Sequence, residues 1–129
     1  MTVVWSSPVR YAECDQQGIV FNGHYLTYAD EACTAWLAAS YRGMLERGLD
    51  IRVKSSTLTW SAPARWGDTV EVSVGEVEVG RTSFTLPLTV ATAAGPVCEV
   101  RTTYVLVDEE ARPVRVPDDL RAAWAAPAL

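Results

Sequence analysis

Asp15 is the residue whose type and position in this sequence most clearly suggest chemistry. It lies in the irregular segment 12–24 (AECDQQGIVFNGH), directly before a helix that is expected to begin near Asn22 or Gly23. The first backbone N–H groups of a helix lack intrahelical acceptors, and with the helix dipole they can stabilise a developing oxyanion. A carboxylate beside such donors is a minimal arrangement for acyl transfer, with Asp15 as base or nucleophile. The competing interpretation is a solvated carboxylate that forms a turn next to Gly18.

Three residues in the same segment as Asp15 each allow a structural and a functional interpretation. His24, the only histidine, either makes a local hydrogen bond in the first helical turn or orients water or Asp15. The chain has no GxSxG motif, so His24 is not expected to complete a Ser-His-Asp triad. On an extended stretch Cys14 points away from the side that Asp15 faces, which favours a core thiol over a nucleophile. Gly18 is either an ordinary turn glycine or a site of close backbone approach to a ligand.

Charge and cysteine content exclude several classes of partner. With 11 Lys+Arg against 16 Asp+Glu the net charge is −5, and without a basic run no nucleic-acid partner is expected. Arg81 and Arg112, in expected turns, either are solvated or converge on a phosphate-bearing ligand. Cys14, Cys33 and Cys98 are widely spaced, which favours free thiols in a reducing compartment over a metal site. The chain has no apolar run that could span a membrane and no signal-like N-terminus, so a cytoplasmic protein is expected.

The 129 residues correspond to a single domain, 1–129, with a strand at its start and one long helix. Residues 1–11 alternate with a two-residue period typical of a strand, broken near Pro8. Residues 25–47 place apolar side chains three and four apart, which predicts one amphipathic helix with Gly48 just beyond its end. The expected apolar stripe consists of Tyr25, Ala29, Ala32, Cys33, Trp36, Leu37, Ser40, Tyr41, Met44 and Leu45.

The rest of the chain, after Arg52, has the alternation of β-strands. Turn signals separate four runs, which are Ser55–Ala62, Val70–Val74, Thr82–Val90 and Val100–Leu106. Long strands with short turns predict an antiparallel meander, and the helix must bury its apolar stripe against one face of that sheet. The expected class is therefore α+β, with a five-stranded antiparallel sheet wrapped around one central helix. Such a sheet has edges, and edge-to-edge pairing in a dimer is one way to cover them.

The segment VRYAECDQQGIVFNGHYLTYADEA resembles the opening of hotdog-fold acyl-CoA thioesterases of the 4-hydroxybenzoyl-CoA thioesterase type. The matching positions are Tyr11, Cys14-Asp15, Gly18, Ile19-Val20 and His24-Tyr25. Later segments are also similar, namely SAPARWGDTVEV with its Gly67-Asp68 step, VEVGRTSFTLPLTV and RPVRVPDDLRAAW. The resemblance covers roughly residues 5–124 and rests on the order of all these segments together.

The resemblance implies a hotdog fold, dimers or dimers of dimers, and active sites at the dimer interface. The thioester hydrolysis expected below requires no metal or redox cofactor. It implies that Asp15 is the catalytic carboxylate and that a backbone N–H near Asn22 polarises the thioester carbonyl. Where the family usually has His or Tyr, this chain has Asn22. Where the family usually has Asn, this chain has His24. The remaining expected contacts are Gly18, Ile19, Val20, Phe21, Gly23, Tyr25, Tyr28 and Trp60 for the substrate, and Arg81 and Arg112 for the CoA phosphates.

The function expected is therefore hydrolysis of an acyl-CoA, or of an acyl carrier protein thioester, to the free acid and thiol. Asp15 either attacks the carbonyl carbon or activates a water, and Asn22 and His24 complete the catalytic group. One alternative is a non-hydrolytic module that binds acyl thioesters with the same fold, because a fold hosts several functions. Another is a hotdog dehydratase with His24 as its histidine, which the absence of accompanying motifs disfavours.

Overall fold

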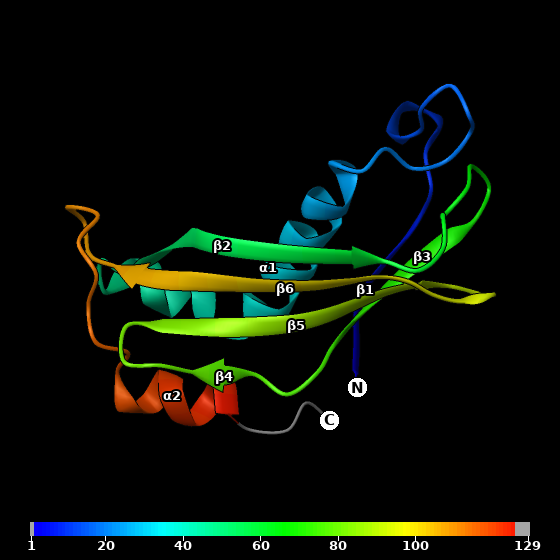
Figure 1. Ribbon diagram of the computed structural model, residues 1–129. Helices are drawn as coiled ribbons and strands as arrows, with labels where there is room; N and C mark the ends of the chain where they lie inside the picture. Colours follow the sequence, from blue (N-terminus) through cyan, green and yellow to red (C-terminus); the bar gives the residue numbers. More distant parts are fainter. Residues whose placement is uncertain (1, 126–129) are drawn as a thin grey trace.

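The computed structural model describes residues 2–125 and shows an antiparallel sheet with a long helix packed on one face (Figure 1). The sheet has the strand order β1-β3-β5-β6-β2, with β4 pairing with β5. Two helices and a short 3-10 helix complete the fold. The elements are β1 (Thr2–Pro8), η1 (Tyr11–Glu13), α1 (His24–Glu46), β2 (Asp50–Trp60), β3 (Thr69–Val74), β4 (Glu78–Val79), β5 (Ser83–Thr92), β6 (Gly95–Val107) and α2 (Asp118–Ala125).

The sheet has six strands, so the expectation of five strands was wrong. The additional strand is β4, whose two residues Glu78 and Val79 pair with Thr85 and Phe84 of β5. Two residues are too short to produce a recognisable alternation, and only the hydrogen bonds to β5 make this segment a strand. The antiparallel pairing and the single long helix agree with the α+β expectation. The strands do not form a meander, because β2 pairs with β6 and β3 pairs with β1 and β5, so that part of the expectation was wrong.

Helix α1 spans His24–Glu46, within one residue of the range predicted from the apolar spacing. Gly23 is its N-cap, and Gly48 beyond its end has a φ of +72°, as expected for a helix-terminating glycine. The apolar stripe is largely buried, but Leu45 is 49% exposed, so its assignment to the stripe was wrong. Met44, fully buried, takes the core position in that turn, and the next residue is rotated about 100° away around the helix.

The core lies between α1 and the alternating inward side chains of the strands. On β5 and along the middle of β6 every second residue is buried, and α2 adds Trp124 over the same region. Phe84 of β5 contacts Trp124 at 4.5 Å and Trp36 of α1 at 5.6 Å between ring centroids. This continuous apolar layer holds α1 in a fixed position on the sheet, and therefore fixes where the start of α1 lies.

Two features of this arrangement matter for a site. Strand β2 forms one edge of the sheet, because its only neighbour is β6. Helix α1 runs antiparallel to β2, since the Tyr25 ring lies 5.9 Å from Trp60 and the Tyr41 hydroxyl bonds to Asp50. The start of α1 is thus at the Trp60 end of the free edge, and the loop of residues 9–23 lies at that end (Figure 1).

Candidate active site

Asp15 lies in a short hairpin, formed by residues 13–21, that leads into α1. At its base the Phe21 N–H donates to the Glu13 carbonyl at 2.9 Å, and Cys14 and Val20 form a β-bridge. At its tip the Gly18 N–H donates to the Asp15 carbonyl at 3.0 Å, and Gly18 has a φ of +74°. This is a β-turn closed by a left-handed glycine, which reverses the chain within four residues.

The Asp15 side chain is exposed and is engaged on one side only. Its Oδ1 accepts the Gln17 N–H at 2.8 Å, which is the turn-forming contact of the simpler interpretation from sequence. The other carboxylate oxygen has no hydrogen-bond partner among residues 2–125. The turn therefore orients the carboxylate while leaving one oxygen open to a ligand or to water.

The start of α1 provides unoccupied backbone donors close behind this hairpin in the chain. The N–H groups of His24, Tyr25 and Leu26 already donate to the carbonyls three residues before them, at 2.9–3.3 Å. Within the described part of the chain, the preceding N–H groups of Asn22 and Gly23 have no acceptor. They stand at the positive end of a 23-residue helix, where an oxyanion is favoured.

The segment of residues 64–66 fixes the hairpin from its other side. Val20 donates its N–H to the Ala64 carbonyl at 2.9 Å, and Trp66 donates to the Gly18 carbonyl at 3.1 Å. The Trp66 ring, 63% exposed, packs edge-on against Tyr11 at 5.2 Å between centroids. Sequence reasoning did not assign Trp66 to this site, because only the tertiary structure brings it beside Gly18.

The other residues predicted to form the site fall into different environments. Phe21 (57% exposed) and Trp60 (44% exposed) are accessible. Val20 and Tyr25 are buried in the core, and the Tyr25 hydroxyl accepts the Ala64 N–H at 3.4 Å. His24 is half-buried, and its buried Nδ1 has no partner among the described residues.

Arg81 and Arg112 are not brought to the Asp15 hairpin within one chain. The Arg81 carbonyl accepts the Val116 N–H, and Arg112 belongs to the turn that follows β6. Both lie at the end of the sheet where Asp50 pairs with Val107, opposite the Trp60 end. Arg112 is further engaged in ion pairs with Asp108 and Glu110.

The Cys14 thiol does not have the surroundings of a nucleophile. It is half-buried, and its Sγ contacts the Arg10 carbonyl at 3.7 Å. Burial raises the pKa of Cys14, and the negative charges of Glu13 and Asp15 raise it further. The thiol is therefore protonated at neutral pH, in agreement with the interpretation from sequence. All three cysteines are free.

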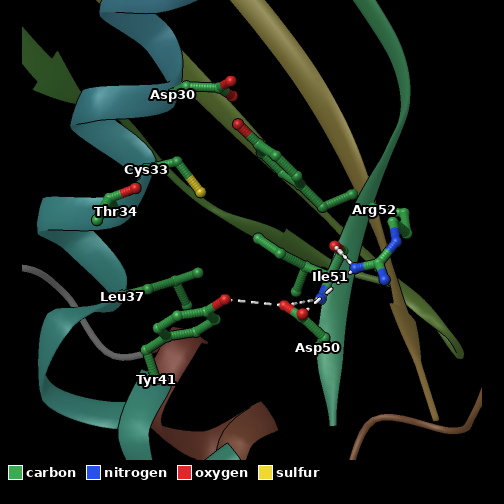
Figure 2. Close-up of a pocket in the computed structure, with 9 residues that line it drawn as sticks. Asp30, Cys33, Thr34, Leu37, Tyr41, Asp50, Ile51 and Arg52 are labelled. Carbon is green, nitrogen blue, oxygen red and sulfur yellow. Dashed lines mark hydrogen bonds and ion pairs between the residues drawn. The ribbon is translucent and has the colours of Figure 1, made fainter. Parts of the chain in front are cut away.

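A cleft of about 330 Å³ opens between α1 and the free edge strand β2 (Figure 2). Figure 2 shows side chains of α1 and of β2 facing one another across it. It is lined from α1 by Asp30, Cys33, Thr34, Leu37 and Tyr41, from β2 by Asp50, Ile51 and Arg52, and from β6 by Tyr104. The lining combines apolar side chains such as Leu37 and Ile51 with polar and charged ones such as Thr34 and Asp50, a combination that suits an organic ligand.

The polar groups of the cleft are only partly satisfied by each other. Asp50 accepts hydrogen bonds from the Tyr41 hydroxyl at 3.0 Å and from the Ile51 N–H at 2.8 Å. Burial opposes ionisation of Asp50, but these bonds and Arg52 outweigh it and lower its pKa. The Tyr104 hydroxyl is buried without a hydrogen-bond partner in the described part of the chain, and burial raises its pKa.

None of the helices within residues 2–125 is long and apolar enough to cross a membrane. In the same range, His, Cys, Asp and Glu side chains form no group of three that could hold a metal ion.

Comparison with known proteins gives consistent matches. The sequence model of a family described as "Thioesterase-like superfamily" matches residues 9–124. "Putative acyl-CoA thioesterase YneP" of Bacillus subtilis (strain 168) is 34% identical over 67 residues, covering 50% of this chain and 49% of that protein. The match thus spans about half the length of the curated relative.

Solved structures are similar over nearly the whole chain. A hypothetical protein, TT1821, from Thermus thermophilus is 29% identical with a TM-score of 0.86, covering 95% of this chain and 97% of that chain. The "PA2801 protein, a putative Thioesterase" from Pseudomonas aeruginosa is 28% identical with a TM-score of 0.80, covering 95% and 98%. Both structures share the fold of this chain, and both matches cover nearly the whole length of the two chains compared.

Proposed function

The chain belongs to the thioesterase-like superfamily, and from this premise we propose that it hydrolyses an acyl thioester to the free acid and thiol. One observation carries the proposal. The open amides of Asn22 and Gly23 follow directly on the hairpin whose turn orients the Asp15 carboxylate. An oriented carboxylate close in the chain to unoccupied N–H donors at a helix start supplies both parts that acyl transfer needs.

The reaction can proceed by two routes from this arrangement. In the first, an Asp15 oxygen attacks the carbonyl carbon, the thiolate leaves, and water then opens the resulting mixed anhydride. In the second, Asp15 accepts a proton from a water that attacks the carbonyl directly, and the thiolate leaves as the tetrahedral intermediate collapses. In both, the negative charge that develops on the carbonyl oxygen is held by the Asn22 and Gly23 N–H groups.

We further propose that two copies pair along their β2 edges. Strand β2 offers 11 residues of edge, including Val53 at 58% exposure and Trp60 at 44%. A long exposed edge is a template for pairing with another strand, and two-fold pairing of identical edges is antiparallel. A pair centred on Ser55 would set Asp50 of one copy opposite Trp60 of the other.

In such a dimer, the cleft between α1 and β2 could bind the acyl group. The cleft lies towards the Asp50 end of the edge, while the Asp15 hairpin of the same chain lies towards the Trp60 end. Antiparallel pairing brings the hairpin of one copy towards the cleft of the other. We propose that the acyl group occupies this cleft, with the thioester carbonyl at the partner's helix start. The substrate is an acyl-CoA or an acyl thioester on an acyl carrier protein.

The decisive experiment is release of free thiol from a panel of aryl and aliphatic acyl-CoAs by the wild type and Asp15→Asn. Asparagine can still accept the Gln17 N–H through its amide oxygen, so the turn is kept while base and nucleophile are lost. We expect turnover to fall by about a hundredfold or more. Asp118→Asn, an exposed carboxylate on α2, is the control and should keep full activity. Normal turnover in Asp15→Asn contradicts the mechanism.

The contact between Asp15 and Gln17 is the observation that favours a second function, a non-hydrolytic acyl-thioester binding module. In such a module the carboxylate would serve only the turn. Saturable binding of acyl-CoA without thiol release from any substrate would support this alternative and exclude hydrolysis of the compounds tested.

A further inference from the structure

Glu13 stands out because it is a buried carboxylate directly beneath the Asp15 hairpin. It is 3% exposed, and it is the only charged residue that is buried within residues 2–125. Removing a carboxylate from water costs several kcal/mol, and a well-packed apolar residue generally stabilises a core as well or better. The partners of its carboxylate therefore decide what Glu13 does at this position, and the Arg10 N–H bond already gives it one local role, as the capping box of η1.

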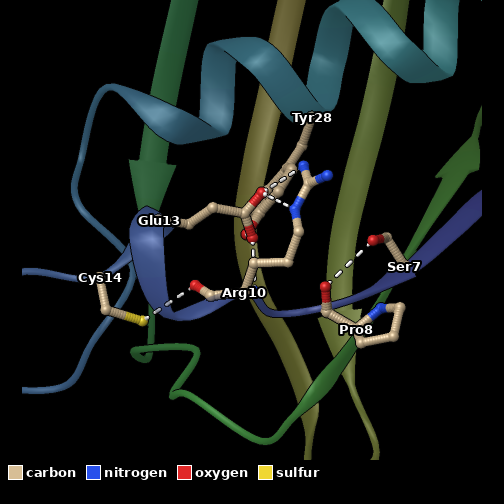
Figure 3. Close-up of polar contacts among 6 residues, drawn as sticks. All are labelled: Ser7, Pro8, Arg10, Glu13, Cys14 and Tyr28. Carbon is tan, nitrogen blue, oxygen red and sulfur yellow. Dashed lines mark hydrogen bonds and ion pairs between the residues drawn. The ribbon is translucent and has the colours of Figure 1, made fainter.

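The carboxylate of Glu13 is held by four hydrogen bonds from two residues (Figure 3). Arg10 donates from its backbone N–H to Oε1 at 2.8 Å, and from Nε and Nη2 to Oε2 at 3.0 and 2.6 Å. The Tyr28 hydroxyl donates to Oε1 at 2.9 Å. Burial raises the pKa of Glu13, but these hydrogen bonds and the Arg10 charge outweigh it, so its pKa is lowered and it is ionised at neutral pH.

These bonds connect the two parts of the candidate active site. Through its main chain, Glu13 forms the base of the hairpin, because its carbonyl accepts the Phe21 N–H. Through its side chain it is tied to Tyr28, which lies one helical turn after His24 in α1. Tyr28 is itself immobilised, with its ring 5.5 Å from Trp5 of β1. Glu13 therefore connects the hairpin that carries Asp15 to the helix whose start carries the open amides.

We propose that Glu13 is a positioning residue, which acts through Tyr28 to fix the Asp15 hairpin relative to the start of α1. The inference rests on the proposed function, since it assumes that the carboxylate of Asp15 and the amides of Asn22 and Gly23 act on one substrate. Displacing reacting groups by about 1 Å can lower turnover by up to a hundredfold without any loss of binding groups. The connection between Glu13 and Tyr28 is thus expected to set kcat rather than KM.

Tyr28→Phe is the sharpest test, because it removes one hydroxyl and leaves the ring packed against Trp5. We expect kcat to fall about tenfold while KM stays within about twofold, at temperatures where the variant is fully folded. Glu13→Gln should lower kcat less, since its amide oxygen still accepts from Tyr28 while the pairing with the Arg10 guanidinium is lost. The matched control is Asp119→Asn, which neutralises a carboxylate held at two points by Arg47 at the far end of α1, and it should keep wild-type kcat.

A second measurement keeps the result interpretable if no thiol is released. Hydrogen exchange of the Asp15 and Phe21 amides, both bonded within the hairpin, should be faster in Tyr28→Phe than in the wild type and in Asp119→Asn. An inactive wild type with faster exchange in Tyr28→Phe would refute the proposed function and leave the structural connection established. Unchanged hairpin exchange, or an active Tyr28→Phe with wild-type kcat, would overturn the positioning role.

Discussion

The same substitution, Gly to Ala, should have opposite effects at Gly18 and Gly43. Gly18 closes the Asp15 turn with a φ of +74°, and Gly43 lies inside α1. Beyond the adjoining residues and the backbone of the helix itself, an added Cβ would have no atom within 4 Å at either position, so contacts do not distinguish them. The difference comes from the backbone alone, because the left-handed region is unfavourable for alanine and the helix is favourable.

The magnitudes follow from these two conformations. Forcing a non-glycine residue into the left-handed region costs about 1–2 kcal/mol, so Gly18→Ala should be less stable by that amount. In a helix interior alanine is favoured over glycine by about 1 kcal/mol, so Gly43→Ala should be more stable. For a chain of this size about 1 kcal/mol corresponds to roughly 4 °C in Tm. Gly18→Asn should lose less than Gly18→Ala, since asparagine tolerates this conformation better.

Thermal and urea unfolding measure both changes, and one fixed protein concentration for all variants keeps the concentration dependence of association the same in each comparison. Thiol release measured alongside tells whether Gly18→Ala also displaces Asp15. A Gly18→Ala variant as stable as the wild type would mean that the left-handed turn is not held in solution. A change of the same sign at both positions would refute the backbone argument altogether.

Three further predictions concern the edge, the cleft and the buried carboxylate. Ser55→Asp should convert a dimer into a monomer, because two-fold pairing near the middle of β2 would bring the two introduced negative charges together. Light scattering measures the molar mass, and an unchanged mass would contradict pairing along this edge. Thr34→Trp should fill the cleft, and therefore raise KM about tenfold or more for bulky acyl-CoAs but not for acetyl-CoA. An equal change in KM for both substrates would refute the role of the cleft as the acyl pocket. Glu13 has a pKa below its usual 4.5, so its stabilising contribution is present above pH 4.5 and is lost as the pH falls through the lowered pKa. The difference in unfolding free energy between wild type and Glu13→Gln should therefore shrink as the pH falls from 4.5 through the lowered pKa, and a constant difference would contradict ionisation of Glu13 in the fold.

The elements of this protein were predictable where the local pattern was long and regular. The three-and-four spacing of apolar residues placed α1 to within one residue, and the glycine after its end marked its C-terminus correctly. The alternation in β5 and β6 identified the residues that face the core. Strand β4 escaped prediction because two residues carry no periodicity, and Leu45 was misassigned because neighbouring positions on a helix differ by about 100°.

By itself the sequence also identified Asp15, Gly18 and the start of α1 as one segment, because these residues are close along the chain. The sequence could not show that Glu13 is buried and tied to Tyr28, that Trp66 lies beside Gly18, or that a cleft opens along β2. Each of these contacts joins residues far apart in the sequence or depends on which face of an element is covered. Short-range patterns record propensities within an element, whereas such contacts arise only when the sheet and α1 pack together.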